Sequence, residues 1–388
     1  MTAARYSPRE MIAKLVSFDT TSRNSNLPLV EFVEAYLAEH GVDTRRVPSA
    51  DGRKANLIAT IGPKAAGGVI LSGHTDVVPI DGQAWVSDPW TVIEKDGKLF
   101  GRGTCDMKSF SAIALALVPQ FLARGLARPL HFALSYDEEV GCIGARDLIE
   151  GLKRDDLAAS AIVVGEPTMM RVVNAHKGIH AMRTIVTGHE VHSSQVHKGV
   201  NAIAVAAELI RYLTELGAIS VDEGDPSGRF DPPFSSIHVG VIEGGTALNI
   251  VPRQCRFDWE IRSLPGSNPD AIIDRFRRFS AEKLLPRMKA IAPESDIETV
   301  EAHVIPAFRT VDPSAAEALA LKLTGRNAAE AVAYGTEAGL FENAGFSTIV
   351  CGPGDIAQAH QPNEFVSLEQ VDLCIAFFER LMDELALR

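Results

Sequence analysis

Residues 68–76 read GVILSGHTD, a short apolar run that ends in a polar cluster with His74 and Asp76. The same order, an apolar run followed by polar residues, recurs at 130–139 (LHFALSYDEE), 161–166 (AIVVGE) and 348–354 (TIVCGPG), and the last leads on to His360. Runs that are apolar throughout predict strands buried on both faces of an α/β sheet. Ligands of such sheets bind at the carboxyl ends of the strands. We therefore expect a functional site where these polar clusters meet.

Helical patterns alternate with these strands and with a further strand at 55–61, which predicts a sheet covered by helices on both faces. Ser7-Pro8-Arg9-Glu10 resembles a capping box that opens the first helix, and Gly41 is typical of a helix C-terminus. The expected helices span about 8–18, 27–40, 108–122, 145–152 and 314–323, and a last one begins at 368.

The middle of the chain, from about 178 to 305, has a different order of elements. Its patterns predict strand, helix, strand, strand, helix and strand, at 180–187, 200–216, 235–241, 255–261, 269–290 and 297–303. This βαββαβ order is that of a ferredoxin-like unit, and the segment is long enough to be a domain. We expect an α/β domain of residues 1–178 and 306–388, interrupted by a small domain of residues 179–305.

The composition excludes several classes of partner. The chain has 388 residues, 46% of them hydrophobic, and a net charge of −12 without a cluster of Lys and Arg. This balance argues against nucleic acid or an anionic membrane as the main partner, and no apolar run is long enough for a membrane span. The start does not read as a signal peptide. Five scattered cysteines without a CxxC pair are typical of a reduced protein, so we expect a cytoplasmic location.

The polar clusters contain imidazole and carboxylate, the ligands that divalent Zn, Co or Mn accept. Two metals about 3.5–4 Å apart need a bridging ligand and terminal ligands on each side. Asp106, in the loop GRGTCD just before a predicted helix, can be the bridge. His74, Glu139, Glu166 and His360 can be the terminal ligands. The set favours a dinuclear metal site.

The adjacent acids Glu138 and Glu139 can have different roles. Glu139 can bind metal, while Glu138 stays free as a general base. Asp76 lies on the same side of an extended chain as His74, where it can fix the tautomer of that imidazole. A histidine at a strand end can also be a plain loop residue, and a pair of glutamates can be a solvated surface. The residues alone leave both interpretations open.

Spacing excludes other kinds of site. The stretch His189-Glu190-Val191-His192 places its histidines three residues apart, whereas the zincin helix needs four. The glycine-bearing stretches lack the lysine of a P-loop and the spacing of a dinucleotide fingerprint. No Gly-x-Ser-x-Gly motif of a serine hydrolase occurs.

Six segments together resemble the metal-dependent aminoacylase/carboxypeptidase family, which includes acetylornithine deacetylases, succinyl-diaminopimelate desuccinylases and glutamate carboxypeptidases. They are SGHTDVVP (72–79), GRGTCDMKS (101–109), SYDEEVGCIGAR (135–146), GEPT (165–168), HSSQVHKGVNAI (192–203) and AQAHQPNEF (357–365). Four segments are most similar to the acetylornithine deacetylases: GTCDMK (103–108), DEEVGCIGAR (137–146), YGTEAG (334–339) and CGPGDIAQAHQPNEF (351–365). The resemblance covers essentially the whole chain.

The resemblance implies a zinc-peptidase-like catalytic domain, with the inserted ferredoxin-like domain as lid and dimerisation module. It assigns the metal ligands in pairs, His74 with Glu166 and Glu139 with His360, with Asp106 between the two metals. It also implies that Glu138 is the base and that the peptide bond after the bridging aspartate is cis.

Four further site residues follow from the resemblance. His192 in the HSS motif contributes to the active site, often from the partner subunit, where it would help to hold the developing oxyanion. Asn249 and Arg262 are candidates to contact the substrate carboxylate, which arginine binds bidentately, although an arginine on a strand can also be solvated. Glu337 is a candidate to attract the ornithine amine, or else a carboxylate at a helix N-terminus.

The implied activity is the deacetylation of N2-acetyl-L-ornithine to L-ornithine and acetate, a step of arginine biosynthesis. The implied enzyme is a homodimer that acts on a small N-acyl amino acid with two divalent ions, zinc or cobalt. A desuccinylase, another N-acyl-amino-acid deacylase or a dipeptidase of the same family stays an alternative. The retained ligands and base argue against a binding protein without catalysis.

Overall fold

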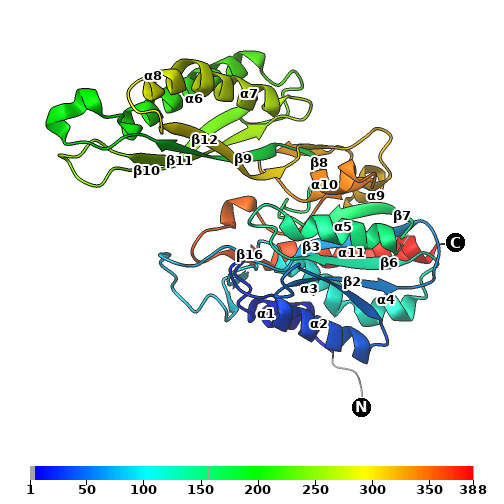
Figure 1. The fold of residues 1–388 in the computed structure, drawn as a ribbon. Coiled ribbons are helices and arrows are strands. Elements are labelled where there is room, and N and C mark those ends of the chain that lie inside the picture. Colours follow the sequence, from blue (N-terminus) through cyan, green and yellow to red (C-terminus); the bar gives the residue numbers. More distant parts are fainter. Residues whose placement is uncertain (1–4, 156, 388) are drawn as a thin grey trace. The chain divides into compact units, whose positions relative to one another are not determined.

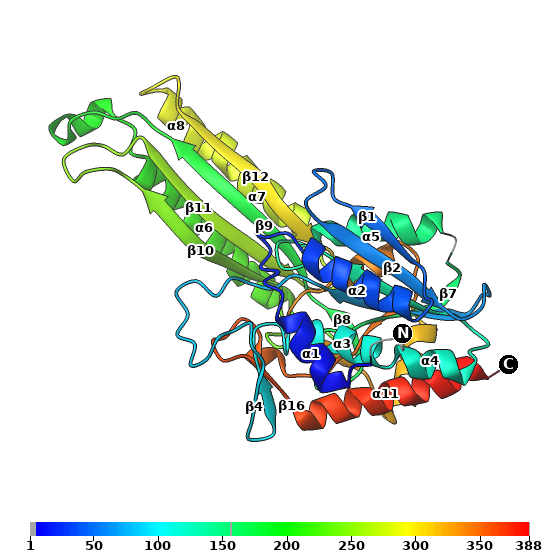
Figure 2. The same cartoon turned by 90° about the horizontal axis from the view of Figure 1, so that it is seen from below.

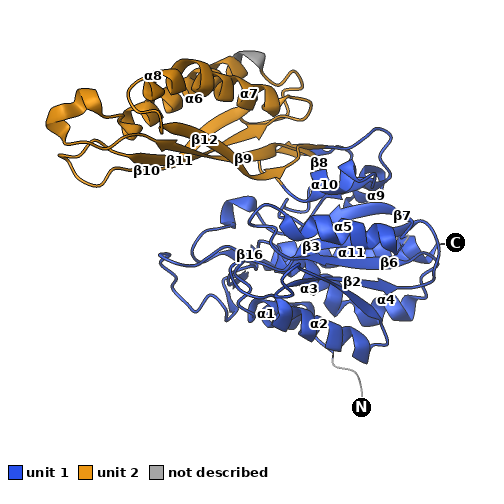
Figure 3. Cartoon of the chain, in the orientation of Figure 1, with its two compact units in different colours: residues 1–174, 309–330, 336–388 blue, residues 175–308, 331–335 orange. Residues whose placement is uncertain are grey.

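The computed structural model describes residues 5–155 and 157–387 and divides the chain into two compact units (Figure 3). Unit 1 consists of residues 1–174, 309–330 and 336–388, and unit 2 consists of residues 175–308 and 331–335. Unit 2 thus interrupts unit 1 and includes a short segment, 331–335, that the sequence assigned to the larger domain. Among the helices of the described residues, none has both the length and the apolar character that a membrane crossing needs.

The larger sheet is mixed and contains the expected parallel strands. Its strands are β1 (Thr44–Pro48), β2 (Ala55–Ile61), β3 (Gly68–His74), β6 (Leu130–Ser135), β7 (Ala159–Val164), β8 (Val173–His176), β13 (Phe308–Arg309), β14 (Glu330–Val332) and β15 (Thr348–Val350). They follow the order β1-β2-β6-β3-β7-β15-β8-β13, with β14 paired to β8. The neighbours β6, β3, β7 and β15 are parallel, so their carboxyl ends lie at one edge (Figure 1).

Helices cover both faces of this sheet, as the alternation of patterns predicted. They are α1 (Pro8–Val16), α2 (Leu27–Glu39), α3 (Lys108–Ala116), α4 (Val118–Arg124), α5 (Ile143–Arg154), α9 (Ala315–Thr324), α10 (Ala338–Asn343) and α11 (Leu368–Ala386). On one face α1, α2, α3, α4, α9 and α11 share an apolar cluster with residues of β2, β3, β6 and β7. Figure 2 shows α1, α2, α3, α4 and α11. On the other face α5 packs on β2 and β6, and α10 packs on β15.

Local sequence signals explain where several helices begin and end. In the capping box of α1, the Ser7 hydroxyl accepts the Glu10 N–H and the Glu10 carboxylate accepts the Ser7 N–H at 2.7 Å. Gly41, just after α2, has a φ of +73°, the conformation that ends helices. The single helix expected at 108–122 is wrong, because the structure has α3 and then α4. Pro119 has no N–H with which to continue the first helix.

The sequence did not predict β1, β8, β13 or β14 of the larger sheet, nor three short strands that form a sheet of their own. These three strands are β4 (Ile93–Lys95), β5 (Lys98–Phe100) and β16 (Phe365–Ser367), in the order β16-β5-β4. The register pairs Phe365 with Phe100. Since residues 101–106 follow β5 and residues 360–364 precede β16, this pairing brings the Asp106 loop and the His360 loop side by side.

Unit 2 has the predicted βαββαβ order. Its elements are β9 (Gly178–Thr187), α6 (Ala202–Glu223), β10 (Ser236–Gly244), β11 (Gln254–Ser263), α7 (Pro269–Phe279), α8 (Leu285–Lys289) and β12 (Asp296–Ile305). The antiparallel order is β10-β11-β9-β12, and the helices lie on one face of this sheet (Figure 1). There they pack around Phe257 and Trp259. The helix expected at 269–290 is interrupted by a π turn at Ser280–Leu284. Pro286, which has no N–H, stands just beyond this turn.

Candidate metal centre

The predicted ligand residues lie at the carboxyl edge of the parallel strands in unit 1. His74 is the last residue of β3, Glu139 follows β6, and Glu166 follows β7. His360 comes after β15 and a short 3-10 turn at Ile356–Gln358. The structure thus brings to one place side chains from four strand ends, as the sequence pattern led us to expect.

Asp106 reaches this edge because α3 packs closely against it. A Cβ on Gly73 would lie 2.6 Å from the hydroxyl oxygen of Ser111, and one on Gly165 would lie 2.1 Å from the ring of Phe110. Both contacts are with α3, so any side chain at these two positions would push the helix away. Asp106 stands just before α3, and the peptide bond that follows it is cis, as predicted.

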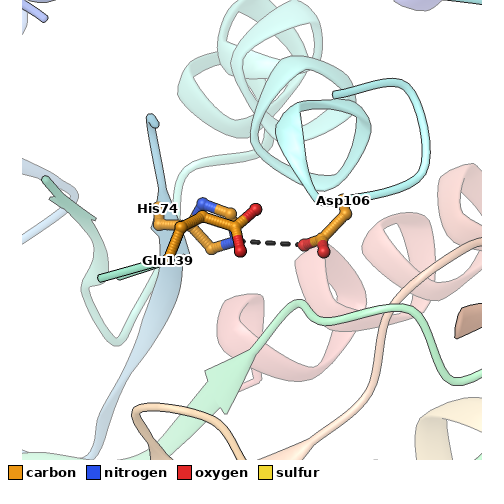
Figure 4. Close-up of side chains that lie close together, drawn as sticks. All are labelled: His74, Asp106 and Glu139. Atoms are coloured by element: carbon orange, nitrogen blue, oxygen red, sulfur yellow. Dashed lines mark hydrogen bonds and ion pairs between the residues drawn. The ribbon is translucent and has the colours of Figure 1, made fainter. Parts of the chain in front are cut away.

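The two carboxylate oxygens of Asp106 face two different histidines. Oδ1 lies 3.1 Å from His74 Nε2, and Oδ2 lies 3.3 Å from His360 Nε2. Each histidine also faces a glutamate: Glu166 Oε1 lies 3.7 Å from His74 Nε2, and Glu139 Oε2 lies 3.0 Å from His360 Nε2. Figure 4 shows His74, Asp106 and Glu139 from this group. The side chains fall into the two pairs that the family resemblance implied, with Asp106 between them.

Burial and mutual repulsion shift the pKa values of these acids. Burial and the charge of Asp106 raise the pKa of Glu139 to about 7 and that of Glu166 well above its usual value. Burial also acts to raise the pKa of Asp106, but hydrogen bonds from His360 and His74 hold it below the ordinary value. Hydrogen bonds to Asp106 and Glu139 raise the pKa of His360 to about 10. The site as a whole attracts positive charge.

The residues fit a bound divalent cation. Ligand atoms of His74, Asp106 and Glu139 lie within 4.8 Å of one another. The buried Oε1 of Glu139 has no hydrogen-bond partner within residues 5–155 and 157–387, and such an oxygen is costly to bury without a ligand. Nitrogen and oxygen donors without a thiolate suit zinc, cobalt or manganese. The set could therefore hold metal.

Glu138 lies beside this group and its backbone is fixed by Asp76. The N–H groups of Glu138 and Glu139 donate to Asp76 Oδ1 and Oδ2 at 3.0 and 3.3 Å, and the Ser22 hydroxyl donates to Oδ2 at 2.7 Å. His74 Nδ1 lies 2.9 Å from the backbone carbonyl of Asp76 and 3.7 Å from its carboxylate. The carbonyl is thus the nearer hydrogen-bond partner of the imidazole, while the carboxylate holds the loop that carries both glutamates.

The environment of Glu138 raises the affinity of its carboxylate for a proton. Its residue is 9% exposed, and the Cys142 thiol lies 3.4 Å from Oε1. Burial raises its pKa well above the ordinary value, and the neighbouring charge of Glu139 acts in the same direction. A carboxylate with raised proton affinity can accept a proton and later return it.

Glu337 is buried, with only 1% of the residue exposed. It precedes α10, and its Oε2 accepts the Ser72 hydroxyl at 3.3 Å. Burial raises its pKa above the usual value. A substrate amine could reach this carboxylate only if the surrounding side chains moved, and its role toward an amine stays a prediction.

The other predicted site residues belong to unit 2. His192 is exposed, and its Nδ1 lies 2.8 Å from the Ser194 hydroxyl. Asn249 is close to it, since the Ser193 N–H donates to the Asn249 carbonyl at 3.0 Å. Arg262 Nε pairs with Glu260 Oε1 at 2.9 Å. Unit 2 thus brings His192 and Asn249 together, while the contact of these residues with a substrate stays a prediction.

Sequence reasoning missed Glu364. This residue lies within the AQAHQPNEF segment, but it was given no role because nothing in the motif distinguishes it from a solvated glutamate. In the structure it is 1% exposed and accepts three backbone N–H groups of the Asp106 loop. Its closeness in sequence to His360 was the only available signal.

Comparisons with known proteins find relatives over nearly the whole chain. The family model of peptidase family M20/M25/M40 matches residues 70–384. The acetylornithine deacetylase of Myxococcus xanthus is 37% identical over 380 residues, which cover 96% of this chain and 96% of that protein.

Solved structures share the fold at low sequence identity. An M20 family metallo-carboxypeptidase from Sulfolobus solfataricus matches with a TM-score of 0.77 and 16% identity, over 97% of this chain and 98% of that chain. A dinuclear metal-binding peptidase of the M20 family from Bacillus subtilis matches with a TM-score of 0.65 and 17% identity, over 98% and 97% of the two chains.

Proposed function

The chain belongs to peptidase family M20/M25/M40, and we propose that it hydrolyses the acetyl amide of N2-acetyl-L-ornithine to give L-ornithine and acetate. The M. xanthus relative, similar over nearly the full length of both chains, carries the name of this activity. The reaction would belong to arginine biosynthesis.

The observation that carries the proposal is the position of Asp106 between two histidines. One carboxylate oxygen faces His74 and the other faces His360, as a bridging ligand requires. Glu166 lies beside the first histidine and Glu139 beside the second. We propose that these five residues hold two divalent ions, zinc or cobalt.

Two such ions would polarise the amide carbonyl and lower the pKa of a water molecule at the site. Glu138 would take the proton of the attacking water at its carboxylate and then deliver it to the departing amine nitrogen. Its raised proton affinity suits both steps. Asp76 supports the reaction by holding the backbone of Glu138 and Glu139 in place.

The residues of unit 2 would bind the rest of the substrate. We propose that His192 donates a hydrogen bond to the oxyanion of the tetrahedral intermediate, from its own chain or from a partner subunit. Asn249 and Arg262 would contact the substrate carboxylate. The exposure of His192 and Asn249 in unit 2 leaves both side chains accessible to a ligand.

We also propose a homodimer formed through unit 2. Strand β10 is an edge strand of its sheet, and Val241 and Ile242 on it are 45% and 52% exposed. An unpaired edge with exposed apolar residues favours pairing with another chain. Light scattering after gel filtration tests this, and a monomer at micromolar concentration would refute it.

The activity is tested by acetate release from protein stripped with a chelator and then restored with zinc or cobalt. We expect no turnover of N2-acetyl-L-ornithine by the stripped protein and full turnover after restoration. N-succinyl-diaminopimelate and a dipeptide serve as comparison substrates. Faster turnover of either comparison substrate would indicate a desuccinylase or a dipeptidase of the same family instead. No hydrolysis with either metal would refute the proposal.

A further inference from the structure

Glu364 lies between the two loops that carry Asp106 and His360. Its Oε1 accepts the backbone N–H groups of Gly103, Cys105 and Asp106 at 3.0, 2.8 and 3.0 Å. A single carboxylate oxygen that collects three N–H groups fixes the path of the loop. The last of these donors is the amide of Asp106 itself, so the bridging aspartate is held directly by this contact.

The second oxygen of Glu364 starts a chain of contacts toward His360. Oε2 accepts Arg102 Nη1 at 2.7 Å, and both side chains are 1% exposed. Arg102 Nη2 donates to Gln83 Oε1 at 2.5 Å, and Gln83 Nε2 donates to the His360 carbonyl at 2.8 Å. The network thus runs from Asp106 to His360, the two residues whose side chains face each other at 3.3 Å.

His360 depends on such a tether more than the other predicted ligands do. Its side chain is 52% exposed, whereas that of Asp106 is 8% exposed. Its backbone has a φ of +63°, a conformation that costs free energy for a residue with a side chain. Packing alone therefore does little to hold the loop that carries the His360 imidazole. The hydrogen bond from Gln83 fixes the His360 carbonyl.

We infer that Glu364 is a positioning residue for the proposed metal centre, because it fixes Asp106 and, through Arg102 and Gln83, the loop of His360. This inference rests on the proposed function and adds to it a determinant of metal affinity. Removing the charge of Glu364 would leave the buried Arg102 without its ion-pair partner and would give the three amides a neutral, weaker acceptor in place of a carboxylate oxygen. The metal ion that we propose to be held by Asp106, Glu139 and His360 would then bind more weakly.

The test is calorimetric titration of chelator-stripped protein with zinc, with kcat and KM for N2-acetyl-L-ornithine measured on the same samples. For Glu364→Gln we expect the weaker of two zinc affinities to fall by about 10- to 100-fold, the range typical of residues that orient metal ligands. We expect kcat to fall with it and KM to stay within about threefold. Glu364→Asp, which keeps the charge, should lose less.

Glu94→Gln is the matched control, because Glu94 forms an exposed pair with Arg9 at 3.0 Å in the same unit. It should bind two zinc ions like the wild type. If Glu364→Gln does not fold, Gln83→Ala is the second test. It removes the half-buried side chain that links Arg102 to the His360 carbonyl and leaves Glu364 and the Asp106 loop unchanged, and it should also weaken zinc binding.

Folded Glu364→Gln or Gln83→Ala protein that binds two zinc ions with wild-type affinity would overturn the inference. A variant with a lower melting temperature and unchanged zinc affinity would do the same, because that is the result of a purely structural role. Failure of the proposed function is a separate outcome, in which the wild type itself releases no acetate.

Discussion

The predicted site residues of unit 1 and those of unit 2 are held in different ways. In unit 1 the side chains of His74, Asp106 and Glu139 are nearly buried and contact one another or a common neighbour. In unit 2 His192 is exposed and contacts Ser194, two residues away. Packing therefore fixes the geometry of His74, Asp106 and Glu139, whereas the exposed His192 can adjust to what it binds.

The largest effect is expected in unit 1, at the general base. Glu138→Gln should lower kcat for N2-acetyl-L-ornithine by about 10³- to 10⁴-fold, the upper range for general acid–base catalysis. Both metal positions should stay occupied, because Glu138 is not among the proposed ligands. Kinetics and metal analysis of the purified variant check this. Activity within tenfold of the wild type would remove Glu138 as the base.

A smaller but still large effect is expected in unit 2. His192→Ala should lower kcat by about 10²- to 10³-fold, the loss typical of one oxyanion donor. The free energy of unfolding should change by no more than about 0.5 kcal/mol, because the residue is exposed. Urea unfolding and steady-state kinetics together test this separation of activity from stability. Unchanged kcat would contradict the proposed role.

A substitution of Asp76 tests whether its carboxylate is needed to hold the loop that carries Glu138 and Glu139. Asp76→Asn keeps the shape but replaces one acceptor of the Glu138 and Glu139 amides by a donor. We expect kcat to fall by about 10- to 100-fold, while zinc remains bound. Wild-type kcat in this variant would mean that the loop of the two glutamates holds its position without the carboxylate.

Substitution of His131 should leave the activity unchanged, because this residue lies near the start of β6, at the opposite end from Ser135. Burial lowers its pKa from the usual 6.5 to about 4. Between these pH values the unfolded chain binds a proton on this imidazole and the folded chain does not. The free energy of unfolding therefore falls as the pH falls through this window, by up to about 3 kcal/mol.

His131→Gln should remove this part of the pH dependence and leave kcat unchanged. Urea unfolding at pH 7 and pH 4.5, with chelator present so that metal release does not contribute, measures the difference. An equal loss of stability in the variant and the wild type would show that His131 is not the cause.

The fold could be predicted well where hydrophobic periodicity was strong. The bounds of β2 and β6 match the apolar runs, and the βαββαβ order of unit 2 followed from the patterns. The break between α3 and α4 at Leu117 was missed because apolar residues continue across it. Strands β4, β5 and β16 were missed because three residues carry too little pattern.

The part of the site that could be predicted from the sequence is the set of side chains whose chemistry suits metal binding. Histidines and acids at strand ends indicated the proposed ligands, because the carboxyl ends of parallel strands meet. The contacts of the Glu364 and Asp76 carboxylates could not be predicted from the sequence. Both accept hydrogen bonds from backbone N–H groups, which leave no pattern in a sequence. Burial of Glu337 was also hidden, since it depends on how α10 packs.

The central claim is that the side chains of unit 1 hold two neighbouring cations. Anomalous diffraction at the zinc absorption edge, from a crystal soaked in zinc, tests it most directly. We predict two peaks about 3.5–4 Å apart, with Asp106 bound to both, His74 and Glu166 on one, and Glu139 and His360 on the other. A single peak, or none at these residues, would contradict the account.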